Sequence, residues 1–429
     1  MLREESWLAA PIALASLATA FAQFVERGFL ARYSDAAVAA ALPGDVLAGT
    51  FSVLITATVS YSATFVAQFH GAGRTERAVA SFAQGLWLTL LSLPFFVAAV
   101  PIGCVYLDHA GHAAELLVAE KAFFSIAMPG GFLTAVSAVL SGLFLGQGRT
   151  RLVACANGVG CLVNVALLPW LVFGGLGLGA LGAAGAAGAR VAAALAVCLV
   201  LLPAVCRDEI VRANLPQFRW DARLLLWLVS KGLPEGVKSF VGAIAFLAFV
   251  TVAGRLDAAA LAVGSVCFAV NNLYGVAERA IAQTVSILVG RARGAGDEAA
   301  LRSAVRSGIL LVGVSAALFF AVVIPLHAGL ARSLYWVFLL RGLCEGAYLV
   351  LDSALKGVGD TRFTMVAEIA AELLVWTPAV ALVLGFTSSV ALLYLTMPLW
   401  LAVGAAVLAV RWRNGLVGCA ALPLAHQPM

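Results

Sequence analysis

Acidic residues inside long apolar runs are the groups in this sequence that could do chemistry. Glu26, Glu278 and Glu345 each stand in such a run, and Glu368 and Glu372 share another. A charged residue at the centre of a bilayer costs roughly 2.5–3.5 kcal/mol on insertion scales, so its presence in a membrane segment needs a reason. A carboxylate in apolar surroundings can take up and release a proton or bind a cation. We therefore look at the neighbours of each acid.

The first acid has polar neighbours at helical spacing. Thr19, Gln23 and Glu26 are four and three residues apart, so on a helix they form one polar stripe. Arg27 is adjacent in sequence and therefore points elsewhere. This pattern predicts an ion-coupling site that contains Gln23 and Glu26. A structural ion pair near the outer membrane interface is the alternative.

The apolar run at 259–290 carries five polar residues, too many for a helix that faces lipid. On a helix, Asn271 and Glu278 share one face, and Asn272, Arg279 and Gln283 share the next. We expect this segment to line a substrate cavity or the interior of its half of the protein.

In two further segments of the second half, acidic residues could serve either in ion coupling or in structural ion pairs. Glu368 and Glu372 are four residues apart and would repel each other if both were ionised, a property that suits a proton carrier. An ion pair of one of them with Arg279 or Arg341 is the alternative. Arg341 also lies four residues before Glu345 on the same helical face, so a structural pair there competes with an ion-coupling role.

Composition places these residues in a membrane. Hydrophobic residues make up 62% of the chain and charged residues 11%, far from the balance of soluble domains. Apolar runs of about 20 residues recur, the length that crosses a bilayer as a helix, so we predict an all-α integral membrane protein and exclude a barrel. The net charge of +5 lies in loops and does not indicate a nucleic-acid partner. We expect no cofactor, no resident metal and no enzyme activity, because the chain shows no nucleophile–base pair, metal motif or GxxxxGK[ST] loop.

The apolar runs predict twelve spans. Lys and Arg residues fall mostly in the loops of one side, which predicts that both termini and the central linker lie in the cytoplasm, with the chain in the inner (cytoplasmic) membrane. The spans are predicted at 7–31, 46–70, 79–106, 121–146, 152–174, 179–204, 224–254, 259–290, 303–329, 333–356, 363–386 and 389–411.

The sequence also repeats itself. FVAQFHGAGRTERA (65–78) matches ILVGRARGAGDEAA (287–300) at an offset of 223, and LGQGRTR (145–151) matches KGVGDTR (356–362) at an offset of 211. Six spans in each copy make the copies parallel across the membrane, an organisation typical of transporters with a ligand cavity between two halves. We predict six-helix lobes at 1–204 and 224–429, joined by a polar linker at 205–223, in a chain that acts as a monomer.

The chain resembles the MATE multidrug and toxin extrusion transporters over nearly its whole length. The residues that carry the resemblance include the two Gly-Ala-Gly turns, LSGLFLGQGRTR (140–151), GLP (232–234) and ALKGVGDTR (354–362). The resemblance implies a pair of six-helix lobes that exports small organic, often cationic, compounds in exchange for entering H+ or Na+.

The resemblance also implies site residues. Glu26 stands where the family usually has aspartate, and Asn164 matches a family asparagine on the fifth span, but Leu168 replaces the aspartate beside it. On our alignment Arg190 falls at a polar position of the sixth span. A single glutamate facing an arginine fits proton exchange better than a Na+ cage, so H+ is preferred over Na+.

In the second half, the resemblance aligns Glu345 with an acidic position of the tenth span, whereas Gly242 stands where some members carry glutamate. Two other functions stay open at this point. A flippase for a lipid-linked oligosaccharide uses a related fold but predicts a cavity rich in cations, and a polytopic enzyme or channel predicts a catalytic constellation or a pore.

Overall fold

The computed structural model describes residues 2–109, 114–175, 177, 179–256, 258–326, 330–386 and 390–414. Within these ranges the side chains of 2–9, 35, 36, 38, 39, 42, 114, 115, 246–256, 258–269, 272, 326, 330–334, 390 and 391 are not described.

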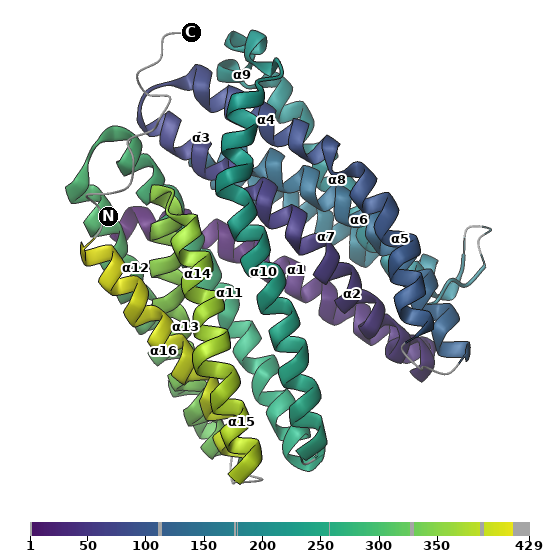
Figure 1. Cartoon of the computed structure of the whole chain (residues 1–429). Helices are drawn as coiled ribbons and strands as arrows, with labels where there is room; N and C mark the ends of the chain where they lie inside the picture. The colour runs from purple at the N-terminus through teal and green to yellow at the C-terminus, as the bar shows by residue number, and fades with distance from the viewer. Residues whose placement is uncertain are drawn as a thin grey trace. The chain divides into compact units, whose positions relative to one another are not determined.

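The described chain is almost entirely helical (Figure 1). Each predicted span corresponds to one long helix or to consecutive shorter ones, because apolar runs of this length satisfy their backbone hydrogen bonds within a helix. The first half contains α1 (Leu2–Tyr33), α2 (Asp35–Ser60), α3 (Ser62–Gly71), α4 (Thr75–Leu91), α5 (Leu93–Asp108), α6 (Ala114–Gly146), α7 (Thr150–Phe173) and α8 (Ala183–Arg207). After the short helix α9 (Glu209–Ala213) come α10 (Ala222–Leu256), α11 (Ala258–Ala295), α12 (Glu298–Val323), α13 (Leu330–Val358), α14 (Thr361–Ala371), α15 (Thr377–Phe386) and α16 (Val390–Asn414).

Eight helical segments among the described residues are long and apolar enough to cross a membrane. The long helices outside this group are α1, α10, α11 and α13. Each of these four carries charged residues in its interior, among them Glu26, Glu278 and Glu345. Each of the four also contains residues whose side chains are not described, so the count of eight covers them only in part.

The repeated turns of the sequence are alike in the backbone. Gly73, Gly148, Gly296 and Gly359 all have φ between 70° and 93°, a region that only glycine enters without strain. In each turn, the N–H of the next residue donates to the carbonyl five residues earlier, as Arg74 does to Phe69 at 2.8 Å. This is the hydrogen bond of a Schellman cap, which ends a helix by satisfying its last carbonyl groups. The glycines thus end α3, α6, α11 and α13 in the same way.

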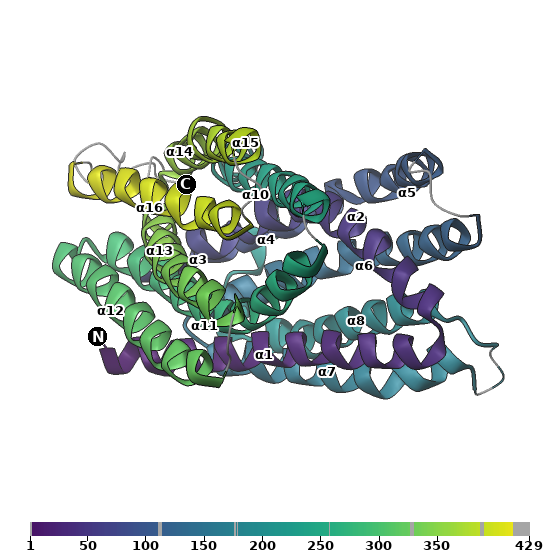
Figure 2. The same cartoon turned by 90° about the horizontal axis from the view of Figure 1, so that it is seen from below.

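The chain divides into two compact units, Ser6–Ile244 and Ala245–Met429 with Met1–Glu5, so the division falls within α10. In the first unit, α6 packs against α2 and α8, α7 packs against α8, and α1 runs alongside α7 (Figure 2). Buried apolar residues such as Leu30, Phe123 and Leu168 form a core there. In the second unit, α13 packs against α11, α12 and α16 around a core that contains Tyr274, Phe320 and Trp376.

The predicted linker is an ordered part of the first unit. The Asp208 carboxylate accepts from the Val211 N–H at 3.1 Å, which caps α9, and it also accepts from Arg149 at 2.6 Å. Gln84 on α4 donates to the Arg219 carbonyl oxygen at 2.9 Å and accepts from the N–H of Asp221 at 3.2 Å. These contacts fasten the connection to the middle of α4 and to the start of α7.

The boundary that differs most from the prediction is the start of the second span. The second span was expected to begin at 46, but α2 begins at Asp35, with Ser34 as its N-cap. Pro43 therefore lies inside the helix, although Pro43 and Gly44 look like a turn in the sequence. Proline is tolerated in membrane helices because neighbouring helices satisfy the freed backbone groups.

Candidate functional site

The polar stripe of α1 faces a cavity inside the first unit. Glu26 is buried, with 2% of its surface exposed. The cavity has a volume of about 210 Å³ and is lined by α1, α6, α7 and α8. Gln23, Glu26, Asn164 and Arg190 all contribute to its wall. The structure thus brings together four residues, from α1, α7 and α8, that the sequence analysis singled out.

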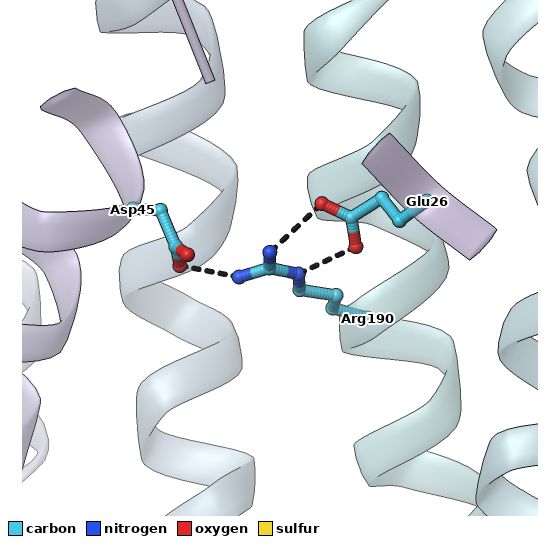
Figure 3. A network of polar contacts seen from close by, with 3 residues as sticks. All are labelled: Glu26, Asp45 and Arg190. Atoms are coloured by element: carbon cyan, nitrogen blue, oxygen red, sulfur yellow. Dashed lines mark hydrogen bonds and ion pairs between the residues drawn. The ribbon is translucent and has the colours of Figure 1, made fainter. Parts of the chain in front are cut away.

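Arg190 on α8 holds the carboxylate of Glu26 through two parallel hydrogen bonds (Figure 3). Its Nε donates to Oε2 at 2.7 Å and its Nη2 donates to Oε1 at 2.8 Å. This is the bidentate arrangement that makes arginine–carboxylate pairs strong and directional. The remaining Nη1 donates to Oδ1 of Asp45 on α2. The ring of Phe123 lies 5.6 Å from the guanidinium carbon, close enough for a cation–π contact.

The site holds more negative than positive charge. When Glu26 and Asp45 are both ionised, they share the single positive charge of Arg190. A buried ion pair is maintained only if its charges and hydrogen bonds are balanced, because removal from water costs several kcal/mol per ion. Uptake of one proton by a carboxylate would make the group neutral. The arrangement is therefore suited to binding one proton.

Asn164 on α7 adds a further polar side chain to the wall of the cavity. It is 4% exposed, and its Oδ1 accepts no hydrogen bond in the described part of the chain. Leu168, one turn later, is fully buried in the apolar core. The position where the resemblance implies an aspartate therefore supplies no second acid to this cavity.

In the second unit, the predicted polar residues of α11 separate into two groups. Asn271 and Glu278 are 2% and 0% exposed, whereas the side chains of Arg279 and Gln283 are exposed. The side chain of Asn272 lies outside the described residues. The two predicted faces of this helix thus have different surroundings, and one of them is interior.

Glu278 lies close to the acid predicted on α13. Glu345 pairs with Arg341 at 2.7 Å on the same helix, and Glu278 interacts electrostatically with both residues. A Cβ on Gly346 would stand 3.1 Å from Oε1 of Glu278, so this glycine gives the carboxylate room. Neither oxygen of Glu278 accepts a hydrogen bond in the described part of the chain. An ionised carboxylate is costly in such surroundings, which suits a group that takes up a proton.

The two acids of the eleventh predicted span have different partners. Glu368 accepts a hydrogen bond from the Tyr348 hydroxyl at 2.5 Å. Glu372 is 4% exposed and begins a π-helical turn, Glu372–Trp376, that separates α14 from α15. Single π-helical turns occur often at functional sites. Both acids therefore stay candidates, and the structure gives each a different environment.

Sequence reasoning missed Asp45. The predicted second span began one residue after it, so Asp45 was assigned to a loop. With the helix begun at Asp35, Asp45, Gly49 and Ser52 lie four and three residues apart, the same spacing as the stripe on α1. The spacing of Asp45, Gly49 and Ser52 is the sequence signal that could have identified Asp45 as part of the site. Among the described residues, no group of three His, Cys, Asp or Glu side chains could hold a metal ion.

Comparison with known proteins assigns the chain to a family. The model of the MatE family matches residues 11–170 and 234–382. The chain is 28% identical over 396 residues to "Multidrug resistance protein PmpM" of Pseudomonas aeruginosa, covering 86% of this chain and 81% of that protein. It is 25% identical over 386 residues to "Probable multidrug resistance protein NorM" of Xanthomonas axonopodis pv. citri, covering 85% and 83%.

Solved structures agree on the fold. A MATE transporter crystallised in complex with MaD3S superposes with a TM-score of 0.86 at 18% identity, covering 96% of this chain and 95% of the other. The eukaryotic MATE transporter AtDTX14 gives a TM-score of 0.82 with the same coverage and identity. The predicted all-α membrane fold and the predicted transporter class are confirmed, and an enzyme is excluded. The chain belongs to the MatE family, the multidrug efflux transporters of the MATE fold, and is a multi-pass membrane protein.

Proposed function

We propose that this chain exports organic, cationic or amphiphilic compounds in exchange for H+, and that Glu26 is the proton site of the first lobe. The single observation that carries the choice of ion is the position of Arg190. Its guanidinium occupies both oxygens of Glu26 and contacts Asp45. A fixed cation therefore stands where a free cation would have to bind.

The need for ligands separates the two ions. Repulsion from the guanidinium, about 4 kcal/mol at roughly 4 Å and an effective dielectric constant of 20, acts on either ion. A Na+ ion would in addition need several oxygen ligands around it, whereas Arg190 already occupies both oxygens of Glu26. A proton forms a bond to the carboxylate oxygen and needs no cage of oxygen ligands. The site thus favours H+.

The size of the cavity favours a site for the coupling ion over a site for the organic substrate. Cavities that bind drug-sized ligands measure about 300–1,000 Å³, and this one is about 210 Å³. Since a water molecule occupies about 30 Å³ in the liquid, the space suits a few water molecules that deliver a proton. We place the organic substrate outside this cavity. The names of the relatives, which are multidrug resistance proteins, support an organic compound as the substrate.

A second group of ion-coupling candidates lies in the other lobe. Glu278 and Glu345 share the charge of Arg341, and Glu368 and Glu372 lie on one helix span. We propose that at least one of these acids also changes its protonation during transport. Coupling requires that proton and substrate prefer different conformations or compete, since equal affinity for both states shifts no equilibrium.

The proposal includes the setting of the protein. We place the chain in the inner membrane, as its bacterial relatives suggest. The Lys and Arg bias of its loops supports both termini in the cytoplasm. We propose that it acts as a monomer.

The test uses the purified full chain in proteoliposomes that contain a fluorescent organic cation. Under an imposed proton gradient we expect dye movement, and under a matched Na+ gradient none. Glu26→Gln should abolish the response to the proton gradient. The proposal fails if the Na+ gradient alone drives transport, or if Glu26→Gln responds to the proton gradient like the unaltered chain.

A further inference from the structure

Arg190 stands between two cavities of the first unit. The second cavity has a volume of about 180 Å³ and is lined by α2, α6 and α8. Arg190 and Thr134 contribute to the walls of both cavities, whereas Glu26 faces the first alone and Asp45 the second alone. The guanidinium, held by a carboxylate on either side (Figure 3), is therefore part of the partition between them.

The two carboxylates hold Arg190 unequally. Glu26 accepts two hydrogen bonds from the guanidinium and is 2% exposed, while Asp45 accepts one and its side chain is 34% exposed. Protonation of Glu26 would cancel the charge that binds two of these donors. Asp45 would then be the remaining anion that balances Arg190. The charged guanidinium cannot stay without a partner in this interior, so it would follow the negative charge.

We propose that Asp45 is a positioning residue that takes over Arg190 when Glu26 is protonated, and that this displacement connects the two cavities. The inference rests on the proposed proton site at Glu26. In the step, a hydronium ion in the first cavity gives its proton to an oxygen of Glu26 and leaves as water. The hydrogen bonds from Nε and Nη2 to Glu26 break, and the bond from Nη1 to Asp45 persists. Release returns the proton to water and restores the bidentate pair.

The second cavity has the space that this displacement needs. A Cβ added to Gly49 on α2 would meet no atom within 4 Å, so the cavity is open at that point. At Gly131 of α6, by contrast, a Cβ would lie 2.3 Å from Oγ of Ser52, so α6 and α2 are closely packed there. The free space of the second cavity therefore lies at Gly49, one turn of α2 from Asp45. Asn164, with its unused Oδ1, offers the first cavity a group that can accept from the protonated carboxyl of Glu26.

Among the described residues, the other groups that face Glu26 supply no competing anion. From its own helix, Arg27 acts on it electrostatically. In the wall of the first cavity, α7 contributes the thiol of Cys161 and the amide of Asn164, and α6 contributes the hydroxyl of Thr134. The charged side chains acting on Glu26 are thus Arg27, Arg190 and Asp45.

The first test is the pH profile of dye transport in proteoliposomes. In Asp45→Asn, the whole charge of Arg190 falls on Glu26, so half-maximal transport should need a proton concentration at least tenfold higher. Asp45→Glu should remain within threefold of the unaltered chain. The control is Asp108→Asn, which also removes the acid of an ion pair in the same unit, that with Lys121, and should leave the profile in place.

The second test fills the space without touching a charge. Gly49→Leu should slow proton-driven transport at least tenfold and leave the unfolding temperature unchanged. Gly158→Leu on α7, where a Cβ also meets nothing within 4 Å, is the matched control. Should Asp45→Asn fail to fold, Asp45→Glu and Gly49→Leu still test the inference.

The outcomes separate the two proposals. An inactive Glu26→Gln together with an unshifted pH profile in Asp45→Asn would overturn the role of Asp45 and leave the proton site standing. Transport by Gly49→Leu equal to that of Gly158→Leu would overturn the displacement. Proton-driven transport by Glu26→Gln would instead remove the proposed proton site.

Discussion

Replacing Gly185 by alanine should disturb the proposed proton site through packing alone. Gly185 lies on α8, and a Cβ there would stand 2.3 Å from the carbonyl oxygen and 2.5 Å from the carbonyl carbon of Leu171 on α7. Carbon–oxygen contacts between helices are normally about 3.3–3.6 Å. The obstacle is backbone, which cannot rotate away. The two helices must therefore separate by roughly 1 Å.

The matched control is three residues along the same helix. A Cβ on Gly188 would lie 3.7 Å from Cδ1 of Leu171, an ordinary contact. Both substitutions gain the same helix propensity, up to about 1 kcal/mol, so this gain cancels when the two variants are compared. Overpacking costs about 1–3 kcal/mol, and we expect Gly185→Ala to be less stable than Gly188→Ala by that amount.

The effect should extend to transport. Arg190 lies five residues after Gly185, about 7.5 Å further along the helix axis at 1.5 Å per residue. A movement of about 1 Å would stretch its bonds of 2.7 and 2.8 Å to Glu26 beyond the range of about 3.2 Å. Thermal unfolding in detergent at one scan rate measures the stability, and proton-driven dye transport measures the site. Equal unfolding temperatures for Gly185→Ala and Gly188→Ala would refute the reasoning.

Three smaller perturbations test other parts of the structure by thermal unfolding. Gly73→Ala puts a side chain at φ 70° and should cost about 1 kcal/mol; an unchanged unfolding temperature would contradict the cap. Asp208→Ala removes both the cap of α9 and the partner of Arg149 and should cost about 1–2 kcal/mol. Asp208→Asn, which still caps, should cost less, and the reverse order would argue against capping. Trp376→Phe removes the bond from its indole N–H to the Thr396 hydroxyl at 3.1 Å and should cost about 1 kcal/mol; no change would show that water replaces it.

The sequence predicted the features that depend on local patterns. Apolar runs predicted the helices, and the repeated glycines predicted the turns, because only a residue without a side chain enters φ near 70° freely. The stripe of Thr19, Gln23 and Glu26 predicted which face of α1 is polar, and all three line the cavity. Such patterns lie within one helix and need no knowledge of its neighbours.

Asp45 could not be found in the same way because its recognition depended on a helix boundary. A proline followed by a glycine is a turn signal, whereas in the structure Pro43 and Gly44 lie inside α2, the helix that carries Asp45. Its partner Arg190 is 145 residues away. The second unit shows the same limit, since the burial of Glu278 and the exposure of Arg279, its neighbour in sequence, depend on which helices cover α11.

The two copies of the repeat share the backbone conformation of their turns but not the positions of their acidic residues. Gly73 and Gly296 retain the same backbone conformation, because any other residue there would be strained in the turn. Position 249, which corresponds to Glu26 in the second copy, is phenylalanine. The acids of the second unit stand instead on α11, α13 and the span of α14. A turn is fixed by backbone geometry that every copy must satisfy, whereas an acid is useful only beside a partner such as Arg190. The proposed proton site at Glu26 therefore belongs to one lobe, and the repeat does not supply a matching acid at the same position in the other.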